Sequence, residues 1–127
     1  MKAALFNAWK EFRFDAAHQL DAGPGGDPHY RRLHGHSYQA EVWVRGPRTP
    51  HGWIVDMGDL ERRLLVIREQ LDHRFLNEIE ALGPPTMENI AAFIWEGLAD
   101  LPQLHRVAVK RQQNGEGCEY YGPGDAV

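Results

Sequence analysis

The sequence predicts an α+β domain in which two helices pack on one face of a small antiparallel sheet. Three observations lead to this prediction: two N-terminal segments in which apolar and polar residues alternate, helical spacing of apolar residues in the middle, and a second alternating pair near the C-terminus. The order strands, two helices, strands is typical of this class. With 127 residues, the chain is long enough for one core, and we expect a single domain over residues 1–127.

Two strands are expected in the first third of the chain. In the first, over residues 5–16, Phe12, Phe14 and Ala16 alternate with charged residues, and His18 falls in phase with the apolar set. The second strand has the same period, with apolar residues at Tyr38, Ala40, Val42 and Val44. Glycine and proline dominate residues 21–28, which predicts a loop between the two strands.

Helical spacing follows a connector at residues 47–52 and a short extended piece at residues 53–56. The first helix has one apolar stripe, and either Asp56 or Asp59 can cap its N-terminus. The second helix is expected to begin near Thr86 and to be stopped by Pro102. The inward-facing residues are Leu60, Leu64, Ile67 and Leu71 in the first helix, and Ile90, Phe93, Ile94 and Leu98 in the second.

A hairpin is expected near the C-terminus. Val107 and Val109 alternate with polar neighbours, residues 114–117 have turn chemistry, and residues 118–121 form a second short strand. The resulting sheet is narrow and exposes its edge strands. Exposed edges are usually covered, and we expect that homo-oligomer formation covers them in this protein.

The overall composition excludes several classes of partner and compartment. The net charge is −4, from 14 Lys and Arg against 18 Asp and Glu, and no basic stripe runs along the chain, so neither nucleic acid nor an anionic membrane is expected as a partner. No apolar run approaches the ~20 residues of a membrane span, and the N-terminal residues do not resemble a signal peptide. Cys118 is the only cysteine, which fits a reducing compartment, so we expect a cytoplasmic protein.

Three histidines form a candidate zinc site. His34 and His36 lie at positions i and i+2, on the same side of an extended chain, and His18 ends the first predicted strand on its apolar side. If the two strands pair, the three rings converge, and three neutral imidazoles with an open fourth position are typical of catalytic zinc. Two alternatives remain at this point, since His18 can be a hydrogen-bonded core residue and Gly35 allows the His-Gly-His segment to be a turn.

A series of short motifs along the chain carries a family resemblance. They are Phe14-Asp-Ala-Ala-His18, Arg32-Leu-His-Gly-His-Ser37, Gly52-Trp-Ile-Val-Asp56, Leu71-Asp-His73, Phe75-Leu-Asn77, Pro85-Thr-Met-Glu-Asn89 and the terminal hairpin. In this order they resemble the 6-pyruvoyl-tetrahydropterin synthase family, over nearly the whole chain. The resemblance is close to the compact bacterial branch that includes 6-carboxytetrahydropterin synthase of queuosine biosynthesis.

The resemblance implies the tunnelling fold, in which a helix pair is inserted between the halves of a small antiparallel sheet. Subunits of this family join their sheets into a barrel, usually as trimers stacked into a hexamer, with active sites at subunit interfaces. It also implies a small-molecule substrate, 7,8-dihydroneopterin triphosphate. In the family, zinc holds the side-chain hydroxyls of this substrate, and a cysteine base with an Asp/His pair moves protons during elimination.

By motif, the resemblance assigns the zinc ligands to His18, His34 and His36, and the catalytic Asp/His pair to Asp72 and His73. A carboxylate that fixes the tautomer of a histidine beside zinc is sensible lyase chemistry. Without the resemblance, Asp72 and His73 are better interpreted as the last turn of a helix, where the imidazole interacts with the helix dipole.

The chain departs from the family pattern at two positions. Tyr30 occupies the position of the catalytic cysteine, four residues before His34, and tyrosine, with a pKa of ~10, is a weaker source of base than cysteine. Asp27 or His29 are alternative bases from the same loop. Arg111 occupies the position of the glutamate that anchors the pterin, and a guanidinium has only donors, so it cannot accept from the pterin amide edge.

Arg111 shares the phase of Val107 and Val109, so it is expected to point where the family glutamate points, and its fork suits a carboxylate or phosphate. The alternative is that its side chain merely extends to solvent from the strand end. Glu116 or Glu119 can supply an acceptor from the hairpin, and Thr86 is available for a polar contact with the ligand.

Three hypotheses about function follow from these departures. The first is a zinc-dependent lyase that resembles 6-carboxytetrahydropterin synthase. The second keeps the zinc scaffold but changes the substrate to another small molecule with an anionic group for Arg111. The third is a zinc-containing binding or assembly protein without catalysis.

Overall fold

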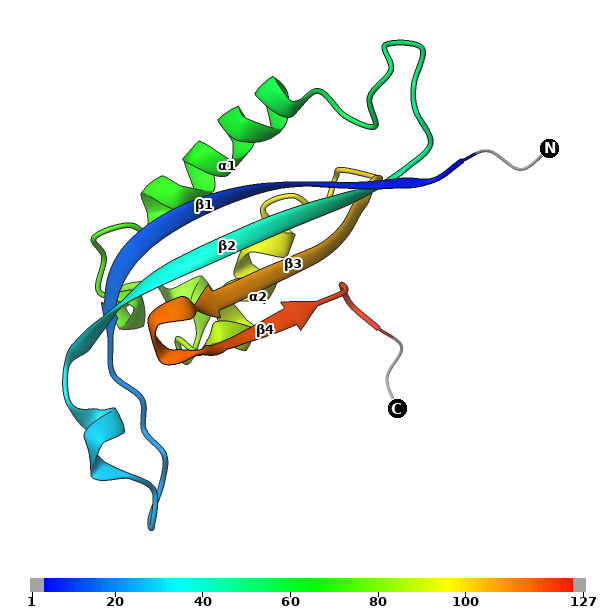
Figure 1. Ribbon diagram of the computed structural model, residues 1–127. Coiled ribbons are helices and arrows are strands. Elements are labelled where there is room, and N and C mark those ends of the chain that lie inside the picture. The colour runs from blue at the N-terminus through cyan, green and yellow to red at the C-terminus, as the bar shows by residue number, and fades with distance from the viewer. Residues whose placement is uncertain (1–3, 125–127) are drawn as a thin grey trace.

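The computed structural model describes residues 4–124 and contains a four-stranded antiparallel sheet with both helices on one face (Figure 1). The strands are β1 (Phe6–His18), β2 (His34–Gly46), β3 (Leu104–Arg111) and β4 (Glu116–Tyr120), and they lie in this order across the sheet. The helices α1 (Met57–Leu71) and α2 (Met87–Glu96) come between β2 and β3 in the chain. The prediction of an α+β fold with two helices inserted between the halves of the sheet is confirmed.

The first two strands are longer than the alternation alone predicted. They pair without interruption from Phe6 opposite Gly46 to His18 opposite His34. The segment from His34 to His36 therefore belongs to a strand, and the alternative of a turn at Gly35 is wrong. The pairing satisfies the backbone of this segment, which local sequence could not reveal.

The core lies between the sheet and the two helices. The alternating apolar residues of all three long strands face the helices, and the residues predicted for the stripe of α1 are buried. Phe93 of α2 is only partly buried, whereas its neighbours Ile90 and Ile94 are fully buried. Other apolar side chains with no measurable exposure are Ala40, Val42, Val44, Leu71, Leu76, Ala91, Leu98, Val107 and Val109.

Helix termini decide between the alternatives that the sequence left open. Asp56, not Asp59, caps α1, because its Oδ1 accepts from the N–H of Gly58 at 2.8 Å. α2 ends at Glu96, earlier than the expected stop at Pro102. Gly97 follows it, and a Cβ there would lie 3.0 Å from the side chain of Ile67 in α1, so the close approach of the two helices favours glycine at this position.

The connector before α1 is folded back on itself. Both the N–H and the hydroxyl of Thr49 donate to the carbonyl of Trp53, at 2.8 and 2.7 Å. Residues 52–55 form a series of bends, so the extended piece expected over residues 53–56 is wrong except at Asp56, the residue that caps α1. A loop that closes through its own hydrogen bonds does not need to pair with the sheet.

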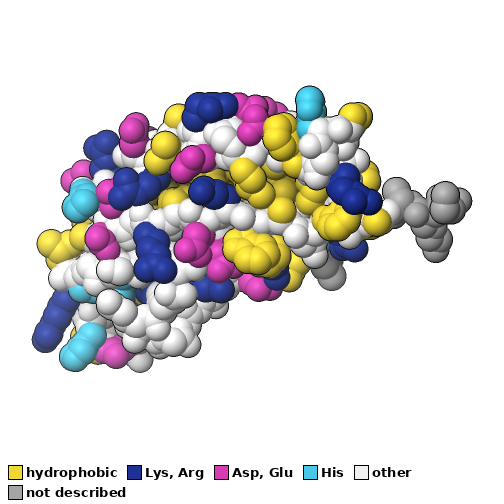
Figure 2. Space-filling model, turned by 45° about the horizontal axis from the view of Figure 1, so that its top comes forward, with side chains coloured by type: hydrophobic (Ala, Val, Ile, Leu, Met, Phe, Trp, Pro, Cys, Tyr) yellow, Lys and Arg dark blue, Asp and Glu magenta, His cyan; other side chains and the backbone are white. Residues whose placement is uncertain are grey.

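Short 3-10 turns complete the chain: η1 (Pro28–Arg31), η2 (Leu76–Glu78), η3 (Glu80–Leu82) and η4 (Gln112–Asn114). The loop that contains η1 projects beyond the end of the sheet (Figure 1, cyan). On the face shown in Figure 2, acidic and basic side chains are interspersed. Within residues 4–124, none of the helices has the length and apolar character needed to cross a membrane.

The capping assignment gives a stability test. Asp56→Ala should reduce the free energy of unfolding by about 1 kcal/mol, since it leaves an amide of the first turn of α1 unpaired. Asp59→Ala, in the first turn of the same helix, removes an exposed ion pair with Arg62 and an interaction with the helix dipole, and should cost less. Urea denaturation of both variants measures the difference. Equal losses would mean that Asp56 does not cap the helix.

Candidate metal centre

Three histidines from two paired strands meet at the end of the sheet. His18 is the last residue of β1 and lies directly opposite His34, the first residue of β2. His36, two residues further along β2, points to the same face as His34. All three rings lie on the side of the sheet that faces the helices. His18 is fully buried, whereas the other two are partly exposed.

The rings surround a common point. Their centroids are 4.5 Å apart for His18 and His34, and 4.9 Å apart for each pair with His36. The ring planes are close to perpendicular, with angles of 71°, 85° and 88°. One nitrogen from each ring lies within 4.8 Å of the other two. The expectation that these three rings converge is therefore confirmed.

Backbone carbonyls orient two of the rings. Nδ1 of His18 is 2.9 Å from the carbonyl oxygen of Pro85, and Nδ1 of His34 is 2.7 Å from the carbonyl oxygen of Arg32. Because a carbonyl can only accept, these nitrogens carry the protons, and each Nε2 keeps a lone pair. The two Nε2 atoms are 2.8 Å apart. Outer hydrogen bonds of this kind orient the histidine ligands of metals.

The surroundings lower the pKa of two of the three imidazoles. Burial lowers the pKa of His36 to about 4, and the positive charge of Arg111 and the two neighbouring rings act in the same direction. Burial also lowers the pKa of His18, against the opposing effect of its hydrogen bond to Pro85. Two lone pairs of Nε2 facing each other at 2.8 Å repel, and a cation between them removes the repulsion. The donor set of three neutral imidazoles fits a divalent metal such as zinc.

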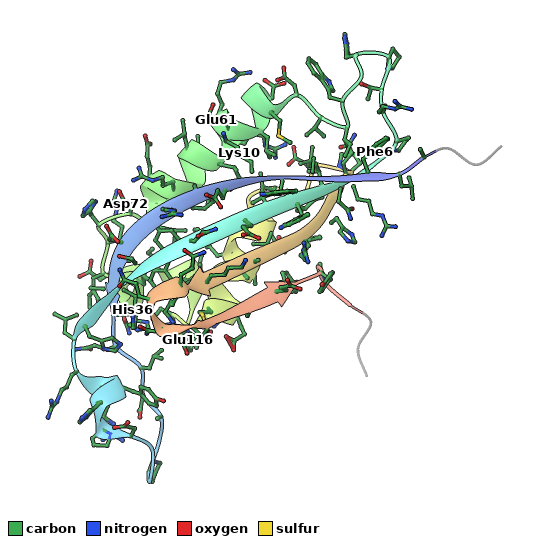
Figure 3. All side chains as sticks on the ribbon, in the orientation of Figure 1. Phe6, Lys10, His36, Glu61, Asp72 and Glu116 are labelled. Atoms are coloured by element: carbon green, nitrogen blue, oxygen red, sulfur yellow. The ribbon has the colours of Figure 1, made fainter. Side chains whose placement is uncertain are left out.

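A cavity of about 620 Å³ lies beside the histidines. It joins residues that are distant in sequence, since His36 comes from β2, Arg111 from the end of β3 and His73 from the turn after α1. In Figure 3, His36, Asp72 and Glu116 lie at the same end of the sheet, whereas Phe6 lies at the other end. The remaining lining residues are Asp15, Ala16, Ala17, Gly35, Ser37, Arg74, Phe75, Gln113 and Asn114.

Asp72 and His73 form a hydrogen-bonded pair at the end of α1. Nδ1 of His73 lies 3.0 Å from Oδ2 of Asp72. The carboxylate accepts a hydrogen bond from the Nδ1–H, and Nε2 is left with a lone pair. The pair is docked on the outer edge of β1, because the N–H of Asp15 donates to Asp72 Oδ1 at 3.0 Å and its carbonyl accepts from the N–H of His73 at 2.7 Å. His73 has a φ of 57°, the only positive value among the described non-glycine residues.

The carboxylate of Asp72 is held in its charged form. The hydrogen bond from the Asp15 amide is the largest cause that lowers its pKa, and Arg68 and His73 add to it. Arg68 bridges the helix and the sheet, since its NH2 lies 3.1 Å from Asp72 Oδ2 and its Nε donates to the carbonyl of Arg13 at 2.7 Å. Asp72 and His73 therefore end α1 and also bind it to the edge of β1.

Arg111 points into the cavity, as its phase in the strand predicted. Its NH1 lies 3.3 Å from Nε2 of His36, and its Nε lies 3.0 Å from Oε1 of Glu116, directly across the hairpin. The side chain is only 16% exposed. The alternative, a side chain extended into solvent, is wrong. Glu119 points elsewhere and pairs with Arg106.

Two of the predicted site residues lie outside this cavity in the single chain. Tyr30 sits in η1 on the projecting loop and is 47% exposed, with Asp27 and His29 paired to each other beside it. The hydroxyl of Thr86 accepts from the N–H of Asn89 and so caps α2. Their roles toward a ligand stay predictions.

Several residues of the site were not predicted from the sequence. Asp15, Ser37 and Arg74 line the cavity, and Ser37 donates to the Asp15 carboxylate at 2.6 Å. Arg68 is the one with a local signal, because it lies four residues before Asp72 on the same helix face. The others depend on strand register, which gives no local signal.

The fold and the site together define an α+β protein with a three-histidine centre of the kind that holds a metal. A model of the 6-pyruvoyl tetrahydropterin synthase family matches residues 7–123. The chain therefore belongs to the 6-pyruvoyl tetrahydropterin synthase family, and the resemblance inferred from its motifs is confirmed.

Named relatives of this chain carry two different activities in their names. One is the 6-carboxy-5,6,7,8-tetrahydropterin synthase of Synechocystis sp., which is 40% identical over 109 residues, or 80% of this chain and 82% of the relative. Another is the dihydroneopterin monophosphate aldolase of Pyrococcus furiosus, 36% identical over 108 residues, or 84% and 86% of the two chains. Among solved structures, the Caenorhabditis elegans 6-pyruvoyl tetrahydropterin synthase matches with a TM-score of 0.81 and 23% identity, covering 97% of this chain and 99% of that one.

The lowered pKa of Asp72 makes its contribution to stability depend on pH. A folded pKa below the unfolded value of ~3.9 means that the contribution is complete above that value and is lost as pH falls through the folded pKa. The stability difference between wild type and Asp72→Asn should therefore be largest near neutral pH and shrink in acid. Denaturation at several pH values measures it. In an Arg68→Met background the difference should be smaller at every pH, and a pH-independent difference would contradict the assignment.

Proposed function

We propose that this chain is a zinc-dependent lyase that acts on a dihydroneopterin phosphate, with 7,8-dihydroneopterin triphosphate as the first substrate to test and a 6-carboxytetrahydropterin synthase reaction, the queuosine-pathway step, as the expected activity. The observation that supports this most is the convergence of His18, His34 and His36 beside a cavity that also contains His73. Family membership supports the same class of substrate.

In this proposal each group has a distinct task. His18, His34 and His36 hold the zinc ion, which polarises a substrate oxygen when bound. His73 is the group that moves protons, since its Nε2 has a free lone pair while Nδ1 donates to Asp72. Asp72 fixes this tautomer and stabilises the imidazolium that forms when Nε2 takes a proton. Asp15 and Arg68 are positioning residues, because Asp15 binds both Asp72 and His73 and Arg68 binds Asp72.

In this proposal Tyr30 takes the position of the family base. The tyrosine that acts in a given cavity can come from a neighbouring subunit. In the single chain Tyr30 lies in η1 and does not line the cavity. We propose that the protein is a homo-oligomer, with a hexamer of two trimers as the expected form, and that the loop approaches a neighbouring subunit. The sheet supports this, because β1 and β4 form its two edges. A cytoplasmic location is part of the same proposal.

A second candidate changes the substrate but keeps the scaffold. Arg111 stands in the wall of the cavity 3.3 Å from His36, where a guanidinium favours a carboxylate or phosphate over a pterin amide. The name of the Pyrococcus furiosus relative supports a phosphate monoester as an alternative to the triphosphate. The third hypothesis, a non-catalytic zinc protein, predicts that Asp72→Asn leaves every ligand-dependent property unchanged.

Zinc binding is the first test. Single changes of His18, His34 or His36 to Ala should abolish stoichiometric zinc, because two imidazoles and water do not retain the ion through dialysis against a weak chelator. Elemental analysis and circular dichroism of each dialysed variant measure zinc content and folding. His51→Ala is the matched control, since this ring stacks on Trp53 in the loop before α1. Folded wild-type protein that never retains zinc would rule out the proposal.

Turnover is the second test. The zinc-loaded protein should convert 7,8-dihydroneopterin triphosphate to a product of lower mass, and His73→Ala should slow this about 10²-fold or more, because it removes the general acid–base group. Mass spectrometry follows the product, with the monophosphate as a second substrate. His105→Ala, a ring packed on Tyr121, should retain full activity.

A third test tries to create activity by reversing the two departures from the family pattern. If the wild type is inactive on the triphosphate, the double change Tyr30→Cys with Arg111→Glu should create activity under the first candidate. Turnover of the monophosphate alone would favour the second candidate. If neither the wild type nor the double variant converted either phosphate, the proposed lyase reaction would be ruled out and only zinc binding would remain.

A further inference from the structure

The guanidinium of Arg111 has two unequal sides. On one side its Nε is 3.0 Å from Oε1 of Glu116, whose side chain is 43% exposed. On the other side its NH1 lies 3.3 Å from Nε2 of His36. The cation thus stands between a solvent-facing carboxylate and the histidine centre, with little exposure of its own.

Two buried donors at this point have no acceptor among the described residues. The Nε–H of Arg111 is close to Glu116 but is not aligned to donate to it. The hydroxyl of Tyr38 is also buried, it donates to none of the described residues, and the guanidinium of Arg111 lies beside it. The ring of Tyr38 lies 5.7 Å from that of His36, centroid to centroid. Unpaired buried donors beside a cation favour an anionic acceptor.

A metal ion bound to the three histidines would make an anionic acceptor beside Arg111 still more favourable. The lone pair of His36 Nε2, which NH1 now approaches, is one that a metal ion would take up. NH1 would then lose this contact with His36 and would stand beside a second cation. Repulsion between cations is strong at short range in a partly buried site, and the carboxylate of Glu116 lies on the far side of the guanidinium.

We propose that Arg111 couples metal binding at the three histidines to binding of an oxyanion, a carboxylate or phosphate group that its guanidinium holds in the cavity. The anion offsets the repulsion and accepts from NH1 of Arg111 on the metal side, so metal and anion each strengthen the binding of the other by the same factor. The inference rests on the metal site of the proposed function. It adds that the substrate carries its negative oxygen at the metal, not only at a distant phosphate.

The test measures zinc affinity by competition with a chromophoric chelator, at constant ionic strength in sodium perchlorate, a weakly coordinating salt. Replacing part of the perchlorate with acetate or methyl phosphate should tighten zinc binding to the wild type about tenfold, the value of one charge-assisted hydrogen bond. The two anions distinguish a carboxylate from a phosphate preference. Arg111→Gln should bind zinc more tightly than the wild type in perchlorate and should lose the response to both anions.

Two further variants make the outcome specific. Glu116→Gln removes the compensating carboxylate, so it should weaken zinc binding in perchlorate and enlarge the anion effect. Arg106→Gln is the matched control, because Arg106 lies on the opposite face of β3, 4.0 Å from the ring centroid of Trp43, and should behave as wild type. Equal zinc affinity in all salts for wild type and Arg111→Gln would overturn the inference while leaving the zinc site intact. Absence of zinc binding in every variant would instead remove the proposed function on which the inference rests.

Discussion

The site depends on one constraint, the uninterrupted pairing of β1 and β2 over thirteen residues. This register sets His18 opposite His34 and turns both rings, with His36, toward the helix side of the sheet. A slip of one residue would turn His18 to the other face and would expose Phe12 and Phe14 at the same time. The hydrophobic core therefore fixes the histidine centre, since the same alternation serves both.

A second level of organisation joins the helices to this sheet. The turn after α1 binds the outer edge of β1 through Asp15, which delivers His73 to the cavity, and the carbonyl of Pro85 before α2 orients His18. The inserted helix pair thus contributes to the site through the segment that joins its two helices, at the end of α1 and just before α2. This explains how residues from four separate segments line one cavity although the sheet itself is a simple meander.

Local patterns predicted the strands, both helices and the three histidines, because each is expressed in a period of two or in helical spacing. They could not decide whether Gly35 lies in a strand or a turn, since that depends on pairing across a loop. Nor could they choose between Asp56 and Asp59, which offer the same chemistry a few residues apart. The roles of Asp15 and Pro85 could not be predicted for a related reason. Asp15 acts on Asp72 through its backbone amide and Pro85 on His18 through its carbonyl, and neither contact depends on the identity of the side chain.

The backbone of His73 places stability and function in opposition. A left-handed conformation costs an ordinary residue roughly 1–2 kcal/mol, and glycine would adopt it freely. The fold alone would favour glycine after Asp72, and in the proposed function the need for an imidazole at this point offsets that cost. A descendant of this protein that no longer used its cavity would therefore be expected to replace His73 with glycine.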